Sequence, residues 1–132
     1  MLSNPNVITL MAVLEAFNRG DIDAVIDKVD PEVVYYVRGQ SQVSGTFRGP
    51  HELGDVLRRI KELTGGTMSG TPDVVLADSD NVMMYIHVTG ARPDGRSYDS
   101  YQAYLYRFRD GQLIEGQTIP VDQHAFEAFL GD

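Results

Sequence analysis

The sequence predicts a single α+β domain in which helices pack on one face of a mainly antiparallel sheet. The chain has 132 residues, a usual length for one domain. Its first half contains segments with apolar residues at helical spacing, and its second half contains β-rich segments separated by short turn signals. Helices followed by a run of strands are typical of α+β domains.

Three helices are predicted in the first half of the chain. Residues 4–20, 21–29 and 50–63 each repeat apolar side chains at intervals of three and four. Asp21 is suited to cap the second of these helices. Gly65 follows the third, where a left-handed glycine commonly ends a helix.

The strands are predicted from β-branched and aromatic residues. The segment "EVVYYVR" is the first of them, and "DSDN", "RPDGR" and "RDGQ" are the turn signals between the later ones. A short C-terminal helix follows Pro120, capped by Asp122. The predicted strands cover residues 32–38, 46–48, 67–78, 81–91, 97–109 and 112–119.

Composition excludes several classes of function. The chain carries 11 Lys and Arg against 19 Asp and Glu, a formal net charge of −8, which argues against a nucleic-acid partner. It has no cysteine, so disulfides, thiol nucleophiles and iron–sulfur clusters are excluded. No apolar run approaches the roughly 20 residues that span a bilayer, and the N-terminus lacks the basic leader of a signal peptide. We expect a cytoplasmic protein with no membrane partner.

Cationic and imidazole side chains outside the strands give no metal or phosphate site. His51 and His124 have no second ligand at metal-binding spacing. The segment "RRIK", residues 58–61, is interpreted as a solvated helix face. We therefore predict no metal and no cofactor.

The first hairpin decides which side chains face the interior. If Asp94 and Gly95 are the two central residues of its turn, His87 lies opposite Gln102. Because opposed residues share a face, the interior would then receive polar groups from both strands. A one-residue bulge would instead bring Asp99, Tyr101 and Ala103 to that face. Under the two-residue turn the polar face consists of Tyr85, His87, Thr89, Ser100, Gln102, Tyr104 and Tyr106.

The second hairpin, at residues 109–112, is open to two interpretations. A two-residue turn places Glu115 beside Gln102, whereas a three-residue loop with Gly111 in the left-handed region places Thr118 there. Only the first brings a carboxylate to the polar face.

Four segments of the chain resemble the nuclear transport factor two-like superfamily, and within it the SnoaL-like polyketide cyclases and the ketosteroid-isomerase relatives. These segments are "VLEAFNRGDIDAVIDKVDPEVVY", "GTFRGPHELGDVLRRI", "YLYRFRDGQLIEG" and "DQHAFEAFL". The resemblance covers essentially the whole chain. It implies one cone-shaped cystatin-like domain over residues 1–132, with a curved sheet around helices, an interior pocket, and homodimers through the outer sheet face.

The catalytic carboxylates of the studied relatives are not carried over. The aspartate base of the isomerases falls near Tyr36, and the acid/base aspartate of the SnoaL-like cyclases falls near Thr118. The resemblance also favours Thr118 rather than Glu115 inside. The remaining family positions, including those of limonene epoxide hydrolase-like proteins, fall near Val13, Tyr85, His87 and Ser100.

His87 is the candidate base, because imidazole exchanges a proton near neutrality. A proton transfer beside a carbonyl also needs a donor for the developing oxyanion, a role predicted for Tyr36 or Tyr85. A core histidine with a satisfied hydrogen bond explains the same pattern without catalysis.

Two functions follow from these residues. The first is an isomerase or cyclase that acts by proton transfer on a hydrophobic ketone-like substrate, and the second is a non-catalytic binding protein for a small hydrophobic ligand. In both, the predicted ligand-binding residues are Leu14, Phe17, Tyr36, Leu57, Ile60, Tyr85, His87, Ser100, Gln102, Tyr104 and Thr118.

Overall fold

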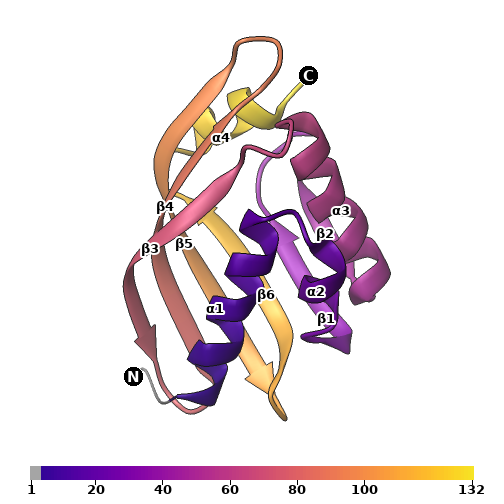
Figure 1. Cartoon of the computed structure of the whole chain (residues 1–132), viewed down its shortest axis with the longest axis vertical. Helices are drawn as coiled ribbons and strands as arrows, with labels where there is room; N and C mark the ends of the chain where they lie inside the picture. Colours follow the sequence, from indigo (N-terminus) through magenta and orange to yellow (C-terminus); the bar gives the residue numbers. More distant parts are fainter. Residues whose placement is uncertain (1–3) are drawn as a thin grey trace.

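A computed structural model describes residues 4–132 as helices packed against one curved sheet (Figure 1). The elements in order are α1 (Pro5–Asn18), α2 (Ile22–Ile26), β1 (Val29–Val37), β2 (Gly45–Arg48), α3 (Gly49–Leu63), β3 (Ser69–Ala77), β4 (Asn81–Ala91), β5 (Ser97–Arg109), β6 (Gln112–Pro120) and α4 (Gln123–Leu130).

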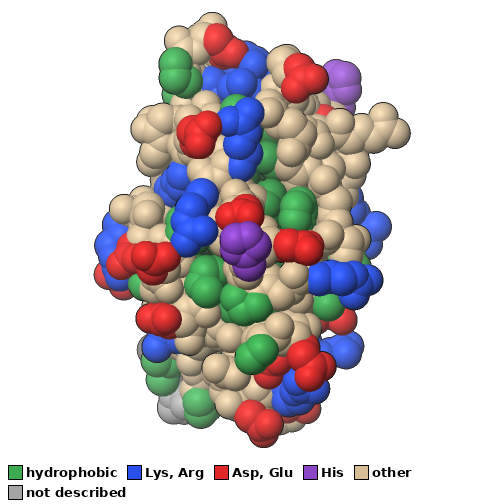
Figure 2. Space-filling model, turned by 90° about the vertical axis from the view of Figure 1, so that its right-hand side faces the viewer, with side chains coloured by type: hydrophobic (Ala, Val, Ile, Leu, Met, Phe, Trp, Pro, Cys, Tyr) green, Lys and Arg blue, Asp and Glu red, His purple; other side chains and the backbone are tan. Residues whose placement is uncertain are grey.

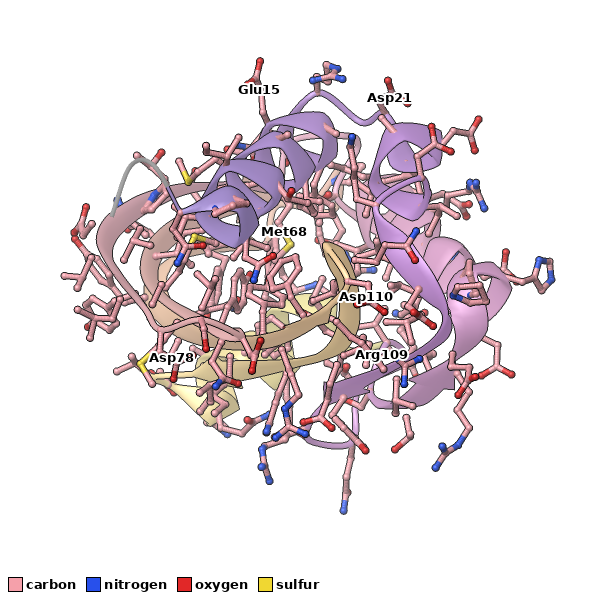
Figure 3. The ribbon with its side chains drawn as sticks, turned by 90° about the horizontal axis from the view of Figure 1, so that it is seen from below. Glu15, Asp21, Met68, Asp78, Arg109 and Asp110 are labelled. Atoms are coloured by element: carbon pink, nitrogen blue, oxygen red, sulfur yellow. The ribbon has the colours of Figure 1, made fainter. Side chains whose placement is uncertain are left out.

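The sheet has six strands in the order β2-β1-β6-β5-β4-β3, and all neighbours are antiparallel except β1 and β6. The ribbon of the sheet curves around an interior filled with side chains, and Met68 lies inside that curve (Figure 3). The predicted α+β arrangement of helices on a curved, mainly antiparallel sheet is confirmed.

The helices begin and end largely where the sequence indicated. Asn4 caps α1 by accepting from the backbone of Asn6 and Val7, and Asp122 caps α4. The second helix is shorter than predicted, because Val29 already pairs with Leu113 in the sheet. No helix within residues 4–132 has the length and apolar content needed to cross a bilayer.

The outer side of α3 is covered by paired charges. Acidic and basic side chains are interspersed on this face of the molecule (Figure 2). Arg58 contacts Asp23 at 2.8 Å, and Arg59 contacts Glu62 at 2.7 Å. The predicted solvated face is wrong for Lys61, which is only 8% exposed and turns toward the interior.

The first hairpin has the bulged turn. Gly95 lies in the left-handed region with φ +97°, and its N–H donates to the carbonyl of Arg92. Residues 93–95 therefore form a three-residue loop, and Arg92 pairs with Arg96. The extra residue shifts the register, so that His87 lies opposite Tyr101 and Ile86 opposite Gln102.

The second hairpin combines features of both predicted forms. Asp110 and Gly111 are its two central residues, with φ values of +52° and +78° that are typical of a two-residue primed turn. A bulge at Ile114 then shifts the pairing, so that Tyr104 lies opposite Thr118 and Arg107 opposite Glu115. Thr118 is consequently buried and Glu115 lies on the other face, as the family resemblance favoured.

Candidate functional site

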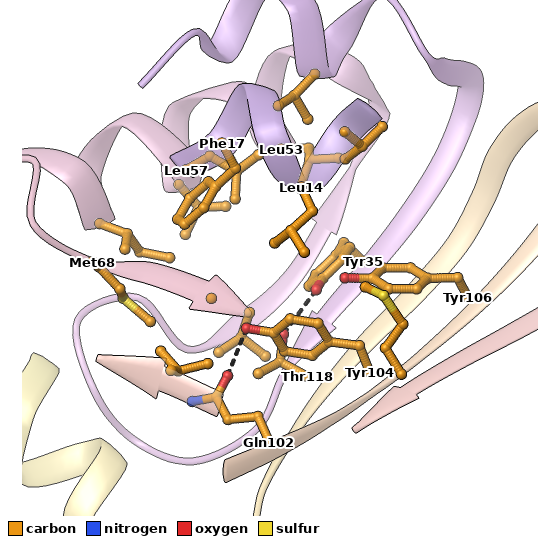
Figure 4. Close-up of a pocket in the computed structure, with 18 of the residues that line it drawn as sticks. Leu14, Phe17, Tyr35, Leu53, Leu57, Met68, Gln102, Tyr104, Tyr106 and Thr118 are labelled. Atoms are coloured by element: carbon orange, nitrogen blue, oxygen red, sulfur yellow. Dashed lines mark hydrogen bonds between the residues drawn. The ribbon is translucent and has the colours of Figure 1, made fainter. Parts of the chain in front are cut away.

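A cavity of about 90 Å³ lies between α1, α3 and the inner face of the sheet. Aliphatic and aromatic side chains form most of its wall, and the few polar groups come from neighbouring strands (Figure 4). Among residues 4–132, no aspartate, glutamate or histidine lines it. Its polar lining residues are Tyr35, Ser69, Gln102, Tyr104, Tyr106 and Thr118.

Gln102 is the centre of one polar network at the cavity wall. The hydroxyl of Tyr104 donates to Gln102 Oε1 at 2.7 Å, and Gln102 Nε2 donates to the Tyr98 hydroxyl oxygen at 3.1 Å. Gln102 is fully buried, so that both bonds are made away from water. Burial raises the pKa of Tyr104 well above its ordinary value, which keeps this phenol neutral.

A second polar network lies on β1 and β6. The hydroxyls of Tyr35 and Thr118 are 2.8 Å apart. Burial raises the pKa of Tyr35 despite hydrogen bonds with Thr118 and Tyr106 that lower it, and burial also raises the pKa of Tyr106 well above its ordinary value. These phenols therefore serve as neutral hydrogen-bonding groups rather than as bases at neutral pH.

Gly116 allows the two tyrosines to approach this wall. A Cβ at this position would lie 2.6 Å from the Tyr35 ring and 3.0 Å from the Tyr106 ring. Only glycine fits beneath both rings, so residue 116 positions the hydroxyls that line the cavity.

Hydrogen bonds join α1 to β3 at the rim of the cavity. Asn18 bonds both backbone groups of Gly70, each at 2.9 Å. Lys61 Nζ donates to the carbonyls of Asn18 and Met68 and lies 4.4 Å from the centre of the Phe17 ring. Burial lowers the pKa of Lys61. Because Phe17, Met68 and Gly70 line the cavity, these contacts fix the position of its rim.

The structure brings seven of the predicted ligand-binding residues together at this cavity. They come from α1, α3, β5 and β6, which are distant in the sequence. These seven are Leu14, Phe17, Leu57, Ile60, Gln102, Tyr104 and Thr118. The other four predicted residues do not line it, although Ser100 does lie on the inner face opposite Val88.

The prediction that His87 and Tyr85 face the interior is wrong. They lie on the outer face of β4, where the side chain of His87 is 36% exposed. His87 contacts Asp99 and stacks on Tyr101, whose ring also stacks on Tyr85. The three-residue loop shifts the register by one, so that His87 shares a face with Tyr101 rather than with Gln102. The opposite face of β4 is aliphatic, and its burial in the interior leaves His87 and Tyr85 outside.

The prediction that Tyr36 lines the pocket is also wrong, and Tyr35 takes its place. Tyr35 is 9% exposed and contacts Thr118, whereas Tyr36 lies on the outer face beside Gln117. The sequence held a signal for this choice. Glu32 and Arg38 are each an even number of residues from Tyr36, and residues that far apart in a strand share one face. Tyr36 is therefore expected on the solvent side together with these charged residues.

The outer-face cluster of His87, Asp99, Tyr101 and Tyr85 has no access to the cavity. It also does not form a metal site, since residues 4–132 contain no group of three histidine, cysteine or carboxylate side chains that could hold an ion. The arrangement can therefore support two kinds of contact: a ligand inside, among neutral hydroxyls, and a partner surface outside.

Comparisons with known proteins place this geometry in a family. A family model described as SnoaL-like domain matches residues 10–116. An uncharacterized protein of Mycobacterium tuberculosis is 27% identical over 114 residues, which are 86% of this chain and 87% of that protein.

Two solved structures share the whole fold. Bal32a, from a soil-derived mobile gene cassette, superposes with a TM-score of 0.89 at 25% identity over 96% of each chain. A protein of unknown function with a cystatin-like fold from Xanthomonas campestris superposes with a TM-score of 0.88 at 26% identity, covering 96% of this chain and 98% of that one. The family match spans most of the chain, and the protein therefore belongs to the SnoaL-like domain family.

Proposed function

We propose that this protein binds a small, uncharged, mainly apolar molecule in the cavity beneath α1 and α3. The observation that carries the proposal is the composition of the wall, in which aliphatic and aromatic side chains surround a few neutral hydrogen-bonding groups. This composition is typical of sites that bury most of a small ligand and orient it by a few polar contacts.

Binding without proton transfer is better supported than an isomerase or cyclase reaction. A proton abstraction at neutral pH needs a base within hydrogen-bond reach of the substrate. Among the described residues the wall offers only phenols, whose burial raises their pKa, together with neutral hydroxyl and amide groups. His87 does not meet this requirement, because it lies on the other face of the sheet.

The volume of the cavity limits the ligand. About 90 Å³ is below the roughly 150 Å³ of an engineered cavity that binds benzene, and well below the roughly 300 Å³ at which pockets for drug-sized ligands begin. A single ring is therefore the largest group that small adjustments of the wall can admit. A polycyclic ligand would require the rim to open, which breaks the hydrogen bonds of Asn18 and Lys61.

Thermal denaturation with acetophenone tests the proposal, because a ligand that binds only the native state raises the melting temperature. We expect Tm to rise with acetophenone concentration. In Val13→Phe, which places a ring in the cavity, the rise should be lost. Met11→Phe adds the same ring at a position that is 40% exposed on the same helix and should preserve it. No rise in the unaltered protein, or an equal rise in both variants, would contradict binding in this cavity.

The outer face of the sheet supports a second copy of the chain as partner. Val74, Leu76, Met83 and Tyr85 are large apolar side chains between 39% and 56% exposed, and all lie on this face. Contiguous exposed apolar surface of this kind is typical of a protein interface. We therefore propose a homodimer through the outer face.

Sedimentation velocity measures this directly. The unaltered protein should sediment as a dimer and Leu76→Asp as a monomer. Ile8 is 56% exposed, as is Leu76, but it lies on α1, so Ile8→Asp should remain dimeric. A dimer in Leu76→Asp would exclude this surface.

A further inference from the structure

We propose that the cavity selects a molecule carrying both a hydroxyl and a carbonyl group, and that Gln102 sets the preference for the hydroxyl. This inference rests on the proposed function and goes beyond it by naming the functional groups of the ligand. It follows from the direction of each hydrogen bond at the two polar networks.

The hydroxyl proton of Tyr104 is already donated to Gln102. The 2.7 Å separation from Gln102 Oε1 fits an O–H···O bond, and the 3.1 Å separation from Gln102 Nε2 to the Tyr98 oxygen fits an N–H···O bond. The amide oxygen therefore faces Tyr104 rather than Tyr98. With its proton donated to Gln102, the Tyr104 oxygen has only lone pairs to offer a ligand, so it accepts a bond from a ligand hydroxyl.

The surroundings of Gln102 hold this direction. Its side chain is fully buried, so water cannot replace either partner. Tyr98, at the far end, is 4% exposed and accepts from Gln102 Nε2. A reversed amide would place two acceptors, Gln102 Oε1 and the Tyr98 oxygen, against each other unless the Tyr98 proton also turned.

At Tyr35 and Thr118, unlike at Tyr104, one hydroxyl proton is still available for a ligand. The two hydroxyls hold two protons, and the 2.8 Å contact between them uses one. One hydroxyl proton therefore remains to be donated, and a ligand carbonyl oxygen is its natural acceptor.

The two networks lie side by side in one apolar space. Tyr104 and Thr118 are opposed residues of β5 and β6, and both line the cavity. Opposed side chains of an antiparallel pair start about 5 Å apart. A single-ring molecule can thus reach an acceptor on β5 and a donor on β6 at the same time.

Four probes of matched shape test this inference by calorimetric titration: ethylbenzene, 3-ethylphenol, acetophenone and 3′-hydroxyacetophenone. They carry neither group, the hydroxyl, the carbonyl, and both. Since a hydrogen bond contributes about 1 kcal/mol, each group should improve affinity by roughly fivefold, and the compound with both should bind tightest.

The outcomes separate the two proposals. If none of the four compounds binds, the proposed function fails and this inference fails with it. If all four bind with equal affinity, the proposed function stands and this inference is overturned. The comparison uses the unaltered protein, so it does not depend on any variant.

Gln102→Met tests the residue that sets the preference. Methionine keeps the length of the side chain but accepts no proton from Tyr104, which is then free to donate. We expect the advantage of acetophenone over ethylbenzene to grow by roughly fivefold, because the freed Tyr104 proton can be donated to a carbonyl, and that of 3-ethylphenol to stay within about twofold of its value in the unaltered protein, because the Tyr104 lone pairs remain. Gln117→Met, on the outer face, should leave both ratios unchanged. An advantage of acetophenone over ethylbenzene that does not grow in Gln102→Met would contradict the role of Gln102.

Discussion

The two faces of the β4–β5 hairpin carry similar residue types but differ in what those residues can do. The inner face holds Tyr98, Gln102 and Tyr104 in a buried hydrogen-bonded network beside the cavity. The outer face holds Tyr101 stacked on His87, which in turn contacts the exposed side chain of Asp99. One inserted residue in the turn thus decides that Gln102 shares a face with Ile86, beside the cavity, while Tyr101 shares the outer face with His87.

The largest expected effect is on the inner face, at Gly116. A methyl group there would lie 2.6 Å from the Tyr35 ring, and overpacking of this kind costs about 1–3 kcal/mol, occasionally more. Urea denaturation of Gly116→Ala should show this loss. Gly54→Ala is the control, since its Cβ would meet the flexible end of Arg58 at 3.0 Å and Ile26 at an ordinary contact distance of 3.5 Å, and alanine favours the helix. Equal stability of Gly116→Ala and the unaltered protein would show that the rings do not pack as described.

Removing one phenolic hydroxyl from each face compares the faces directly. Tyr35→Phe leaves the buried Thr118 hydroxyl without its partner and should lower the free energy of unfolding by about 1–3 kcal/mol. Tyr101→Phe removes a hydroxyl from the exposed outer face and should cost less than about 0.5 kcal/mol. Chemical denaturation measures both, and a larger loss for Tyr101→Phe would reverse the assignment of the faces.

Alkaline pH should act on the inner face. Burial raises the pKa of Tyr35, Tyr104 and Tyr106, whereas in the unfolded chain tyrosine ionises near pH 10. Below pH 10 both states are neutral, so the pH has no effect through these groups. Above it the unfolded state loses protons that the folded state keeps, and stability falls as the pH rises toward the folded pKa values.

The Tyr104→Phe variant isolates one of these groups. Above pH 10 the free energy of unfolding of this variant should fall less steeply with pH than that of the unaltered protein. The two slopes should differ by up to about 1.4 kcal/mol per pH unit. Met83→Leu, on the outer face, should retain the original slope. Denaturation curves between pH 9 and 11 would contradict the burial of Tyr104 if its replacement left the slope unchanged.

The smallest effect is expected at His87. Its contact with Asp99 is exposed, and such pairs contribute about 0–1 kcal/mol. His87→Ala should therefore change stability by less than about 1 kcal/mol and leave acetophenone affinity within twofold. A loss of acetophenone binding in His87→Ala would contradict the placement of His87 outside the ligand site.

The elements of the fold could be predicted from the sequence because each carries a local signal. Apolar spacing marked the helices, and the turn residues of "RPDGR" and "RDGQ" marked the hairpins. The cavity residues of α1 and α3, such as Leu14 and Ile60, followed from helical spacing alone.

The sequence did not predict equally well which side chains of each strand point to the interior, because the register of strand pairing depends on single residues. "PDG" suits both a two-residue turn and the three-residue loop that the structure contains. The bulge at Ile114 has no glycine or proline to mark it. On β4 both faces carry large side chains, Met83 and Tyr85 outside against Met84 and Ile86 inside, so hydrophobicity alone did not choose between them.

Methionine methyl resonances distinguish a ligand on the inner face from one on the outer face, because Met83 and Met84 are consecutive residues on opposite faces of β4. Met84 lines the cavity together with Met68, while Met83 is 41% exposed on the outer face. In ¹³C-methyl-labelled protein titrated with 3′-hydroxyacetophenone, we expect the signals of Met84 and Met68 to shift and that of Met83 to stay. A shift of Met83 with Met84 and Met68 unchanged would contradict a ligand site on the inner face.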